Sequence, residues 1–229
     1  MSKVHLLSKY YSTSKTKYRY VSSKTRGVNE RIIASKRGKD YFDGLRRYGY
    51  GGYKYDGRWA KFAQIIIKKY KLNNNSRILH LNSEKGFLLY EIKKILPNVL
   101  IFAYETSKYA IQKSITQDIR NRTKYTESYL KLGSFKKKFD LSIAIGVIYA
   151  MPLEDSINML KYLKKNSKNS FVTLASYESE RDFILWKNWS LLGCLLFKEK
   201  EWKIVLKKSN YDHDYEMINS KTLNLKKKL

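Results

Sequence analysis

Residues 77–107 carry the pattern that most constrains the fold of this 229-residue chain. A short apolar run, Ile78 to Leu81, leads into a tight loop, and the loop leads into a segment whose apolar residues recur at helical spacing. A second apolar run follows and ends in a carboxylate, Glu105. Strand, loop, helix, strand and acid in this order predict the βαβ unit that binds adenosine cofactors at the carboxyl ends of parallel strands.

The alternation of strand and helix patterns continues to residue 219. It predicts a single α/β domain with a doubly wound, mostly parallel sheet and helices on both faces. We expect helices over 28–37, 61–70, 108–119, 154–164, 181–196 and 199–208, and strands near 125, 139–145, 171–176 and 215–219. Residues 1–40 form a basic, partly flexible N-terminal extension whose first 17 residues are expected to be a mobile tail. Residues 41–222 form the α/β domain, and 223–229 a basic tail.

The charge of the chain is strongly positive, with 47 Lys and Arg against 20 Asp and Glu, a formal net charge of +27. Such a charge attracts phosphate groups, so weak non-specific binding to nucleic acid is expected at low salt. The lysines are spread along the chain, and no nucleic-acid-reading motif accompanies them. Compositional bias towards A- and T-rich codons explains the charge better than a dedicated nucleic-acid site.

Other features bound the cellular context. No apolar run reaches the length of a membrane span, and the N-terminus lacks the apolar core of a signal peptide, so a cytoplasmic protein is expected. The single cysteine, Cys194, stands among leucines and reads as a core thiol. No cysteine or histidine cluster predicts a metal site.

An aromatic and glycine-rich segment spans residues 41–59. Its glycines argue against regular structure, and its aromatic residues are too many for a bare linker. We expect an ordered loop that either caps a pocket or packs on the sheet edge. Its arginines would suit a phosphate or carboxylate on a substrate. The candidate substrate contacts are Arg46, Arg47, Tyr50, Tyr53, Arg58 and Trp59.

The run from Ile78 to Leu89 resembles motif one of the class I S-adenosylmethionine-dependent methyltransferases, because Lys85-Gly86-Phe87-Leu88-Leu89 matches the end of that motif. Glu105, the following Ser-Lys-Tyr-Ala-Ile of residues 107–111, and Phe139-Asp140 also match the family pattern. The segment 41–59 and Glu201-Trp202 resemble a bacterial subgroup that we associate with sugars and other small metabolites. The resemblance covers roughly residues 18–219.

The resemblance implies a Rossmann-like fold and S-adenosylmethionine as cofactor. It places the methionine moiety beside the loop 82–86 and the ribose hydroxyls on Glu105. The implied cofactor-binding positions are His80, Asn82, Glu84, Gly86, Glu105, Thr106, Glu127 and Gly146. Candidate catalytic residues at the exits of later strands are Tyr149 and Tyr177, although an unperturbed tyrosine is a poor general base.

The chain departs from the family pattern at three positions. His80 replaces the motif-one acid, and we expect an imidazole that is hydrogen-bonded locally. Asn82 and Glu84 replace glycines that admit the cofactor, and a Glu84 carboxylate facing the methionine carboxylate would repel it by ~4 kcal/mol at ~4 Å. Glu84 could instead turn outward or pair with the cofactor's ammonium. These departures argue against binding of normal strength.

Three functions stay open. The first is a methyltransferase acting on a small molecule or sugar-type metabolite. The second is a catalytically inactive relative, a pseudoenzyme that acts as the partner subunit of another protein or as a binding module. The third is a polyanion-binding protein on the same scaffold. Binding of the cofactor separates the first two, and the salt dependence of affinity identifies the third.

Overall fold

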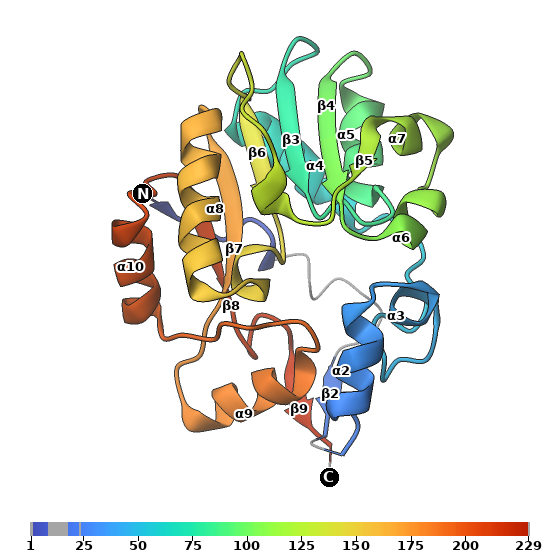
Figure 1. Cartoon of the computed structure of the whole chain (residues 1–229), viewed down its shortest axis with the longest axis vertical. Coiled ribbons are helices and arrows are strands. Elements are labelled where there is room, and N and C mark those ends of the chain that lie inside the picture. The colour runs from blue at the N-terminus through green and yellow to red at the C-terminus, as the bar shows by residue number, and fades with distance from the viewer. Residues whose placement is uncertain (1, 9–17, 23, 229) are drawn as a thin grey trace.

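A seven-stranded sheet forms the centre of the protein in a computed structural model that describes residues 2–8, 18–22 and 24–228 (Figure 1). The strand order is β1-β8-β7-β6-β3-β4-β5, and every described pairing in this sheet is parallel. The predicted doubly wound sheet is confirmed, and its order reverses between β3 and β6. The strands are β1 (Ser2–Lys3), β3 (Arg77–Leu81), β4 (Leu100–Glu105), β5 (Thr123–Tyr125), β6 (Leu141–Ala144), β7 (Ser170–Ala175) and β8 (Asp214–Ile218).

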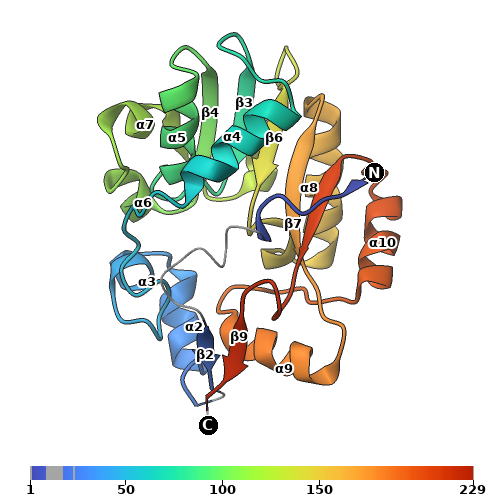
Figure 2. The ribbon, with the colours of Figure 1, turned by 180° about the vertical axis from the view of Figure 1, so that it is seen from behind.

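Helices cover both faces of the sheet, as the sequence predicts (Figures 1 and 2). On one face, α4 (Trp59–Lys69) and α5 (Phe87–Ile95) bury apolar side chains against β3 and β6. On the other face, α8 (Leu153–Asn166) and α10 (Glu199–Lys208) pack against β7 and β8. Trp202 of α10 is fully buried there, and its indole N–H donates to the carbonyl of Ala175 at 2.6 Å.

Two predicted helices differ from the structure. The pattern over 108–119 folds as two short helices, α6 (Lys108–Gln112) and α7 (Gln117–Arg122), because Thr116 caps a new helix by accepting from the amide of Ile119. The pattern over 181–196 ends early, since α9 spans Glu180–Trp189. The 3₁₀ turns are η1 (Tyr129–Lys131) and η2 (Ile148–Ala150). Among the described residues, no helix has both the length and the apolar character that a bilayer crossing requires.

A second layer faces the carboxyl ends of the strands and lies below the sheet in Figure 1. It contains α2 (Val28–Ser35), α3 (Lys39–Asp43), α9 and a two-stranded parallel sheet of β2 (Arg19–Val21) and β9 (Leu225–Lys227). A small apolar cluster around Trp186 joins this layer to the ends of β7 and β8. The basic tail predicted over 223–229 is therefore wrong at 225–227, which form a strand.

The N-terminal residues also differ from the predicted mobile tail. Residues 2–3 add β1 to the edge of the sheet, and Leu7 is buried in the cluster beneath α4 and α5. The fully buried carboxylate of Glu216 accepts the backbone amides of Leu6, Leu7 and Ser8 at 2.9, 2.7 and 2.7 Å. Residues 9–17 of the predicted tail lie outside the described residues.

Replacing Glu216 with glutamine is expected to release this segment. A glutamine side chain has one acceptor oxygen and no charge, so at least one of the three charge-assisted hydrogen bonds is lost, at a cost of about 2 kcal/mol. Hydrogen exchange at Leu6, Leu7 and Ser8 should then accelerate at least tenfold. The control is Glu199→Gln, which removes an exposed ion pair with Lys3 and should change little. Equal exchange in the two variants would contradict this anchoring role.

Candidate functional site

A cavity of about 950 Å³ lies between the carboxyl ends of the strands and the second layer. Its volume falls within the range of ordinary small-molecule sites. Most residues that the sequence predicts for the site line this cavity. They are Asn82, Glu84, Thr106, Glu127, Gly146 and Tyr149 from the sheet side, and Arg46, Tyr50, Tyr53, Arg58 and Trp59 from the aromatic segment.

The loop after β3 has the backbone of a glycine-rich turn without its glycines. Asn82, Glu84 and Gly86 have φ values of 61°, 53° and 78°, all in the left-handed region. A side chain in this region costs roughly 1–2 kcal/mol, so the turn keeps its shape at Asn82 and Glu84 against local preference. The Asn82 side chain compensates in part, because its Nδ2 donates to the carbonyl of Ile145 at 3.0 Å.

Gly86 serves the packing of the loop. A Cβ atom there would lie 2.2 Å from Cγ2 of Ile119, and Gly86 does not line the cavity. The left-handed φ favours glycine, and this close approach leaves no room for a Cβ atom. The packing and the backbone conformation therefore explain why glycine occupies position 86 without any contact to a cofactor.

Glu105 ends β4 as predicted, but its carboxylate is fully buried. It accepts the amides of Glu84 at 2.7 Å and Ser107 at 2.8 Å. It also accepts from Nη2 of Arg37 at 2.9 Å, and the same nitrogen reaches Oδ1 of Asn82 at 2.7 Å. Burial opposes the charge on Arg37, yet the nearby Glu105 raises the pKa of Arg37 above its usual value. A guanidinium therefore occupies the side of Glu105 where the resemblance places ribose hydroxyls.

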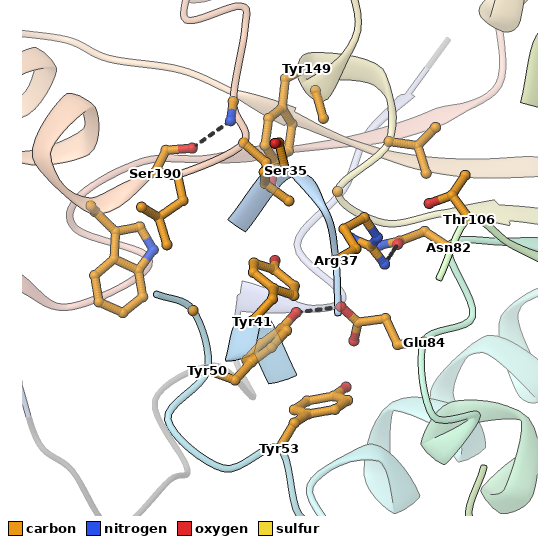
Figure 3. A pocket seen from close by; sticks show the side chains of 18 of the residues that line it. Ser35, Arg37, Tyr41, Tyr50, Tyr53, Asn82, Glu84, Thr106, Tyr149 and Ser190 are labelled. Carbon is orange, nitrogen blue, oxygen red and sulfur yellow. Dashed lines mark hydrogen bonds between the residues drawn. The ribbon is translucent and has the colours of Figure 1, made fainter. Parts of the chain in front are cut away.

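The Glu84 side chain neither turns outward nor stays unpartnered. It is buried, and its carboxylate accepts the hydroxyl of Tyr50, whose ring lies 4.3 Å from that of Tyr53 (Figure 3). Burial raises the pKa of Glu84, while Arg37 and the Tyr50 hydroxyl act in the opposite sense. The hydrogen bond from Tyr50 therefore holds a Glu84 carboxyl group with a raised pKa at the cavity wall.

The aromatic and glycine-rich segment folds over the same loop. Lys85 is buried and donates to both carboxylate oxygens of Asp43 at 2.7 Å and to the carbonyl of Tyr53 at 2.8 Å. Burial opposes the charge on Asp43, but hydrogen bonds from Lys85 and Tyr109 lower the pKa of Asp43. The prediction of an ordered loop is confirmed, except that Tyr41 to Asp43 belong to α3 and Trp59 begins α4.

His80 lies behind this loop beside a smaller cavity of about 130 Å³. Its Nδ1 atom is buried and has no hydrogen-bond partner among the described residues, which contradicts the predicted local hydrogen bond. Burial lowers the pKa of His80 to about 3. The imidazole is therefore neutral at physiological pH. Ser83 Oγ is likewise buried and unpartnered among these residues, and Leu7 closes the same cavity.

Three other predictions about single residues are wrong. Tyr177 packs edge-on against Phe183 and does not line the cavity. Arg47 stacks on Tyr48 outside it. Cys194, expected in the core, is exposed and lines the cavity.

Several cavity residues come from segments that carry no motif. Arg26, Arg31 and Arg37 lie in the stretch that the sequence analysis treats as an extension, and Trp186 and Trp189 lie on α9. The spacing of the two tryptophans on one helix indicates that they are buried, but it does not indicate a cavity. Within residues 2–8, 18–22 and 24–228, no three His, Cys, Asp or Glu side chains are grouped to hold a metal ion.

The residues fit S-adenosylmethionine once one side chain moves. The cavity is large enough for the cofactor, and Thr106, Glu127 and Tyr129 line its wall. The buried hydroxyl of Tyr129 has no hydrogen-bond partner among the described residues. At the ribose position, the carboxylate of Glu105 becomes available only when the guanidinium of Arg37 leaves it. The Arg37 side chain is 15% exposed and lines the cavity, so the guanidinium that has to move is at the cavity wall.

Comparisons with known proteins support the fold. The magnesium protoporphyrin IX methyltransferase of Synechocystis, solved with bound SAH, matches with a TM-score of 0.53 and 16% identity over 78% of this chain and 87% of that one. The YcgJ protein of Bacillus subtilis matches with a TM-score of 0.50 and 12% identity over 64% and 66%.

Other matching structures are longer than this chain. PKMT2 of Rickettsia typhi, solved with AdoHcy, is 22% identical over 43% of this chain and 21% of its own, with a TM-score of 0.38. The chain spans about half of the next three. The sequence matches no protein-family model and no curated protein. The strand order, the turn after β3 and the likeness to these two structures together show that this chain has the fold of the class I S-adenosylmethionine-dependent methyltransferases.

Proposed function

We propose that this protein is an S-adenosylmethionine-dependent methyltransferase that acts on a small molecule, with sugar-type metabolites as the first class to examine. The observation that carries the proposal is the cavity at the carboxyl ends of β3, β4 and β6. The turn after β3, with three residues in the left-handed region, lies beside this cavity. The fold and the SAH bound to the Synechocystis protein support it. The substrate is a small molecule because the cavity holds about 950 Å³.

Bound S-adenosylmethionine would supply an electrophilic methyl group. Glu105 would bind the ribose after release from Arg37, with Thr106, Glu127 and Gly146 lining the adenosine side. Asn82 and Glu84 would lie beside the methionine moiety. Tyr149 lines both cavities, and a Cβ atom at Gly146 would lie 3.7 Å from its hydroxyl and 3.5 Å from Nδ2 of Asn82. This geometry supports a role for Tyr149 in orienting a substrate towards the turn.

A second function is favoured by the hydrogen bonds and the ion pair that occupy the Glu105 carboxylate. With Arg37 and two amides on its carboxylate, the ribose position is filled by the protein itself. A binding module that no longer takes the cofactor, alone or with a protein partner, would retain this arrangement. Methyl transfer and cofactor-free binding therefore differ in one measurable property, the affinity for S-adenosylmethionine.

Replacing Glu84 with glycine is expected to strengthen that affinity about tenfold. The change removes a carboxylate from the cavity wall and suits a position with φ of 53°. Isothermal titration with S-adenosylmethionine and S-adenosylhomocysteine would measure it. Glu178→Gly is the control, because Glu178 pairs with Lys221 away from the cavity.

Each outcome selects one function. Binding by the wild type, strengthened in Glu84→Gly and unchanged in Glu178→Gly, supports the methyltransferase. Absence of binding in the wild type and in Glu84→Gly would reject it in favour of the binding module. Equal affinities in wild type and Glu84→Gly would show that Glu84 does not face the cofactor.

A further inference from the structure

Arg26, Arg31 and Arg46 line the cavity wall opposite the sheet, and Arg19 of β2 lines it as well. Arg26 precedes α2, Arg31 lies within it, and Arg46 follows α3. They gather around α9: the guanidinium carbons of Arg26 and Arg46 lie 4.6 and 4.7 Å from the ring centroid of Trp189. Nη2 of Arg31 donates to the carbonyl of Lys187 at 2.9 Å. Three cationic groups from two segments, one around α2 and one after α3, thus meet at one end of the cavity.

Arg26, Arg31 and Arg46 have no carboxylate partner among the residues that the structure describes. Within residues 2–8, 18–22 and 24–228, none of the ion pairs includes Arg26, Arg31 or Arg46. Two other arginines of the same cavity differ, since Arg37 pairs with Glu105 and Arg58 with Asp56. The unpaired cluster is therefore a local feature of the wall formed by α2, α3 and α9.

The cluster holds like charges close together. Arg26 is half-buried, and its pKa is lowered to about 10 by burial first and by the charge of Arg46 second. Its guanidinium donates to the carbonyls of Trp189, Arg46 and Gly49. These contacts satisfy some N–H groups and leave the positive charge without a counter-charge. An anion in the cavity would remove this repulsion.

Donor capacity remains for such an anion. A guanidinium carries five N–H groups, and Arg46 uses one of them, on the carbonyl of Gly49. Arg46 is exposed and lines the cavity. The planar fork of an arginine matches the oxygens of a phosphate or carboxylate. Three such groups match the double charge of a phosphate better than the single charge of a carboxylate.

We propose that Arg26, Arg31 and Arg46 form a subsite for a phosphate group carried by the small molecule that binds in this cavity. Trp189 forms the adjoining wall. If the proposed methyl transfer is correct, the phosphate belongs to its substrate, and that part of the inference rests on the proposed function. The phosphate subsite itself does not depend on the cofactor. The sequence alone suggested the arginines of the aromatic segment, among them Arg46 and Arg47. The subsite that we propose keeps Arg46, adds Arg26 and Arg31, and leaves out Arg47.

Titration with inorganic phosphate, followed by tryptophan fluorescence in the absence of cofactor, tests the subsite. Arg46→Gln should weaken phosphate binding at least tenfold. Arg47→Gln is the matched control, because its side chain lies next in sequence and stacks on Tyr48 outside the cavity; it should bind as the wild type does. Arg31→Gln is a second variant at a different wall position and should also weaken binding.

The outcomes are distinct. Loss of phosphate binding in Arg46→Gln and Arg31→Gln, with Arg47→Gln unaffected, supports the subsite. Acetate binding as tightly as phosphate would overturn the phosphate assignment, and so would a duplex oligonucleotide competing at equal phosphate concentration. Absence of phosphate binding, or equal binding by all variants, would overturn the subsite.

Thermal unfolding separates the subsite from a structural brace. Arg46→Gln should melt no lower than the wild type, because it removes a like charge beside Arg26. A clearly lower melting temperature would overturn the proposal by showing that Arg46 holds the loop. Failure to bind S-adenosylmethionine would reject the methyltransferase and leave the phosphate result intact, so the two failures can be told apart.

Discussion

Replacing Arg37 with methionine should lower the free energy of unfolding by about 3 kcal/mol, because it leaves the buried carboxylate of Glu105 without its cation. Methionine retains much of the aliphatic volume, so the loss reports the charge. The side chain of Glu105 is 0% exposed, and the amides of Glu84 and Ser107 would be its main remaining donors. These amides explain why we expect the lower end of the range for a broken buried pair. Urea unfolding at neutral pH would measure the effect.

A double-mutant cycle isolates the Arg37–Glu105 pair. The variant with both Arg37→Met and Glu105→Gln should be more stable than the sum of the single changes implies, by about 2 kcal/mol. Arg47→Met, at an exposed position, should stay within about 0.5 kcal/mol of the wild type. Strict additivity of the two changes would show that the ion pair contributes nothing specific.

The same pair shows where sequence reasoning stopped. The position of Glu105 follows from local pattern, since an apolar run predicts the strand and the acid marks its end. Its partner lies 68 residues earlier in the chain, in a segment without a motif. Charge and spacing do not state which of the many basic side chains reaches a buried acid. The position of Glu105 at the end of its strand was therefore predictable, and its ion pair with Arg37 was not.

The chain ends show the same limit. The central strands β3, β4, β6 and β7 are runs of apolar residues, and the local sequence pattern alone predicts them. In contrast, β2 and β9 are three residues each and pair over the whole length of the chain, Arg19 with Leu225. Such short strands are stabilised by the tertiary contacts around Trp186, and a local pattern does not reveal them.

The aromatic and glycine-rich segment was predicted more fully than other loops. Its aromatic content indicated packing, and the structure shows Tyr50 and Tyr53 against the loop after β3. The segment both lines the cavity and packs at the strand ends, so the two alternatives left open by the sequence describe the same contact. The clamp of Lys85 on Asp43 was not predicted, because it depends on the position of α3.

The pH dependence of stability should depend strongly on His80. Its pKa is lowered to about 3 by burial in the folded protein, whereas an unfolded chain protonates histidine near pH 6.5. Below pH 6.5 the unfolded state therefore binds more protons, and stability falls as pH falls until the folded imidazole also titrates near pH 3. Between pH 7.5 and 4.5, His80 alone should remove about 3 kcal/mol. Above about pH 7.5 it should have no effect.

Comparison with His80→Leu isolates this contribution, because leucine has no titratable group. Urea unfolding of both proteins between pH 4.5 and 8 should give curves that converge or cross as pH falls, with the wild type losing about 3 kcal/mol relative to the variant. NMR of the folded wild type should show a His80 ring that does not titrate from pH 8 down to 5. Parallel stability curves, or a ring that titrates near pH 6.5, would mean that solvent reaches the imidazole. The unpartnered Nδ1 beside the 130 Å³ cavity would then be hydrated and the site behind the turn open.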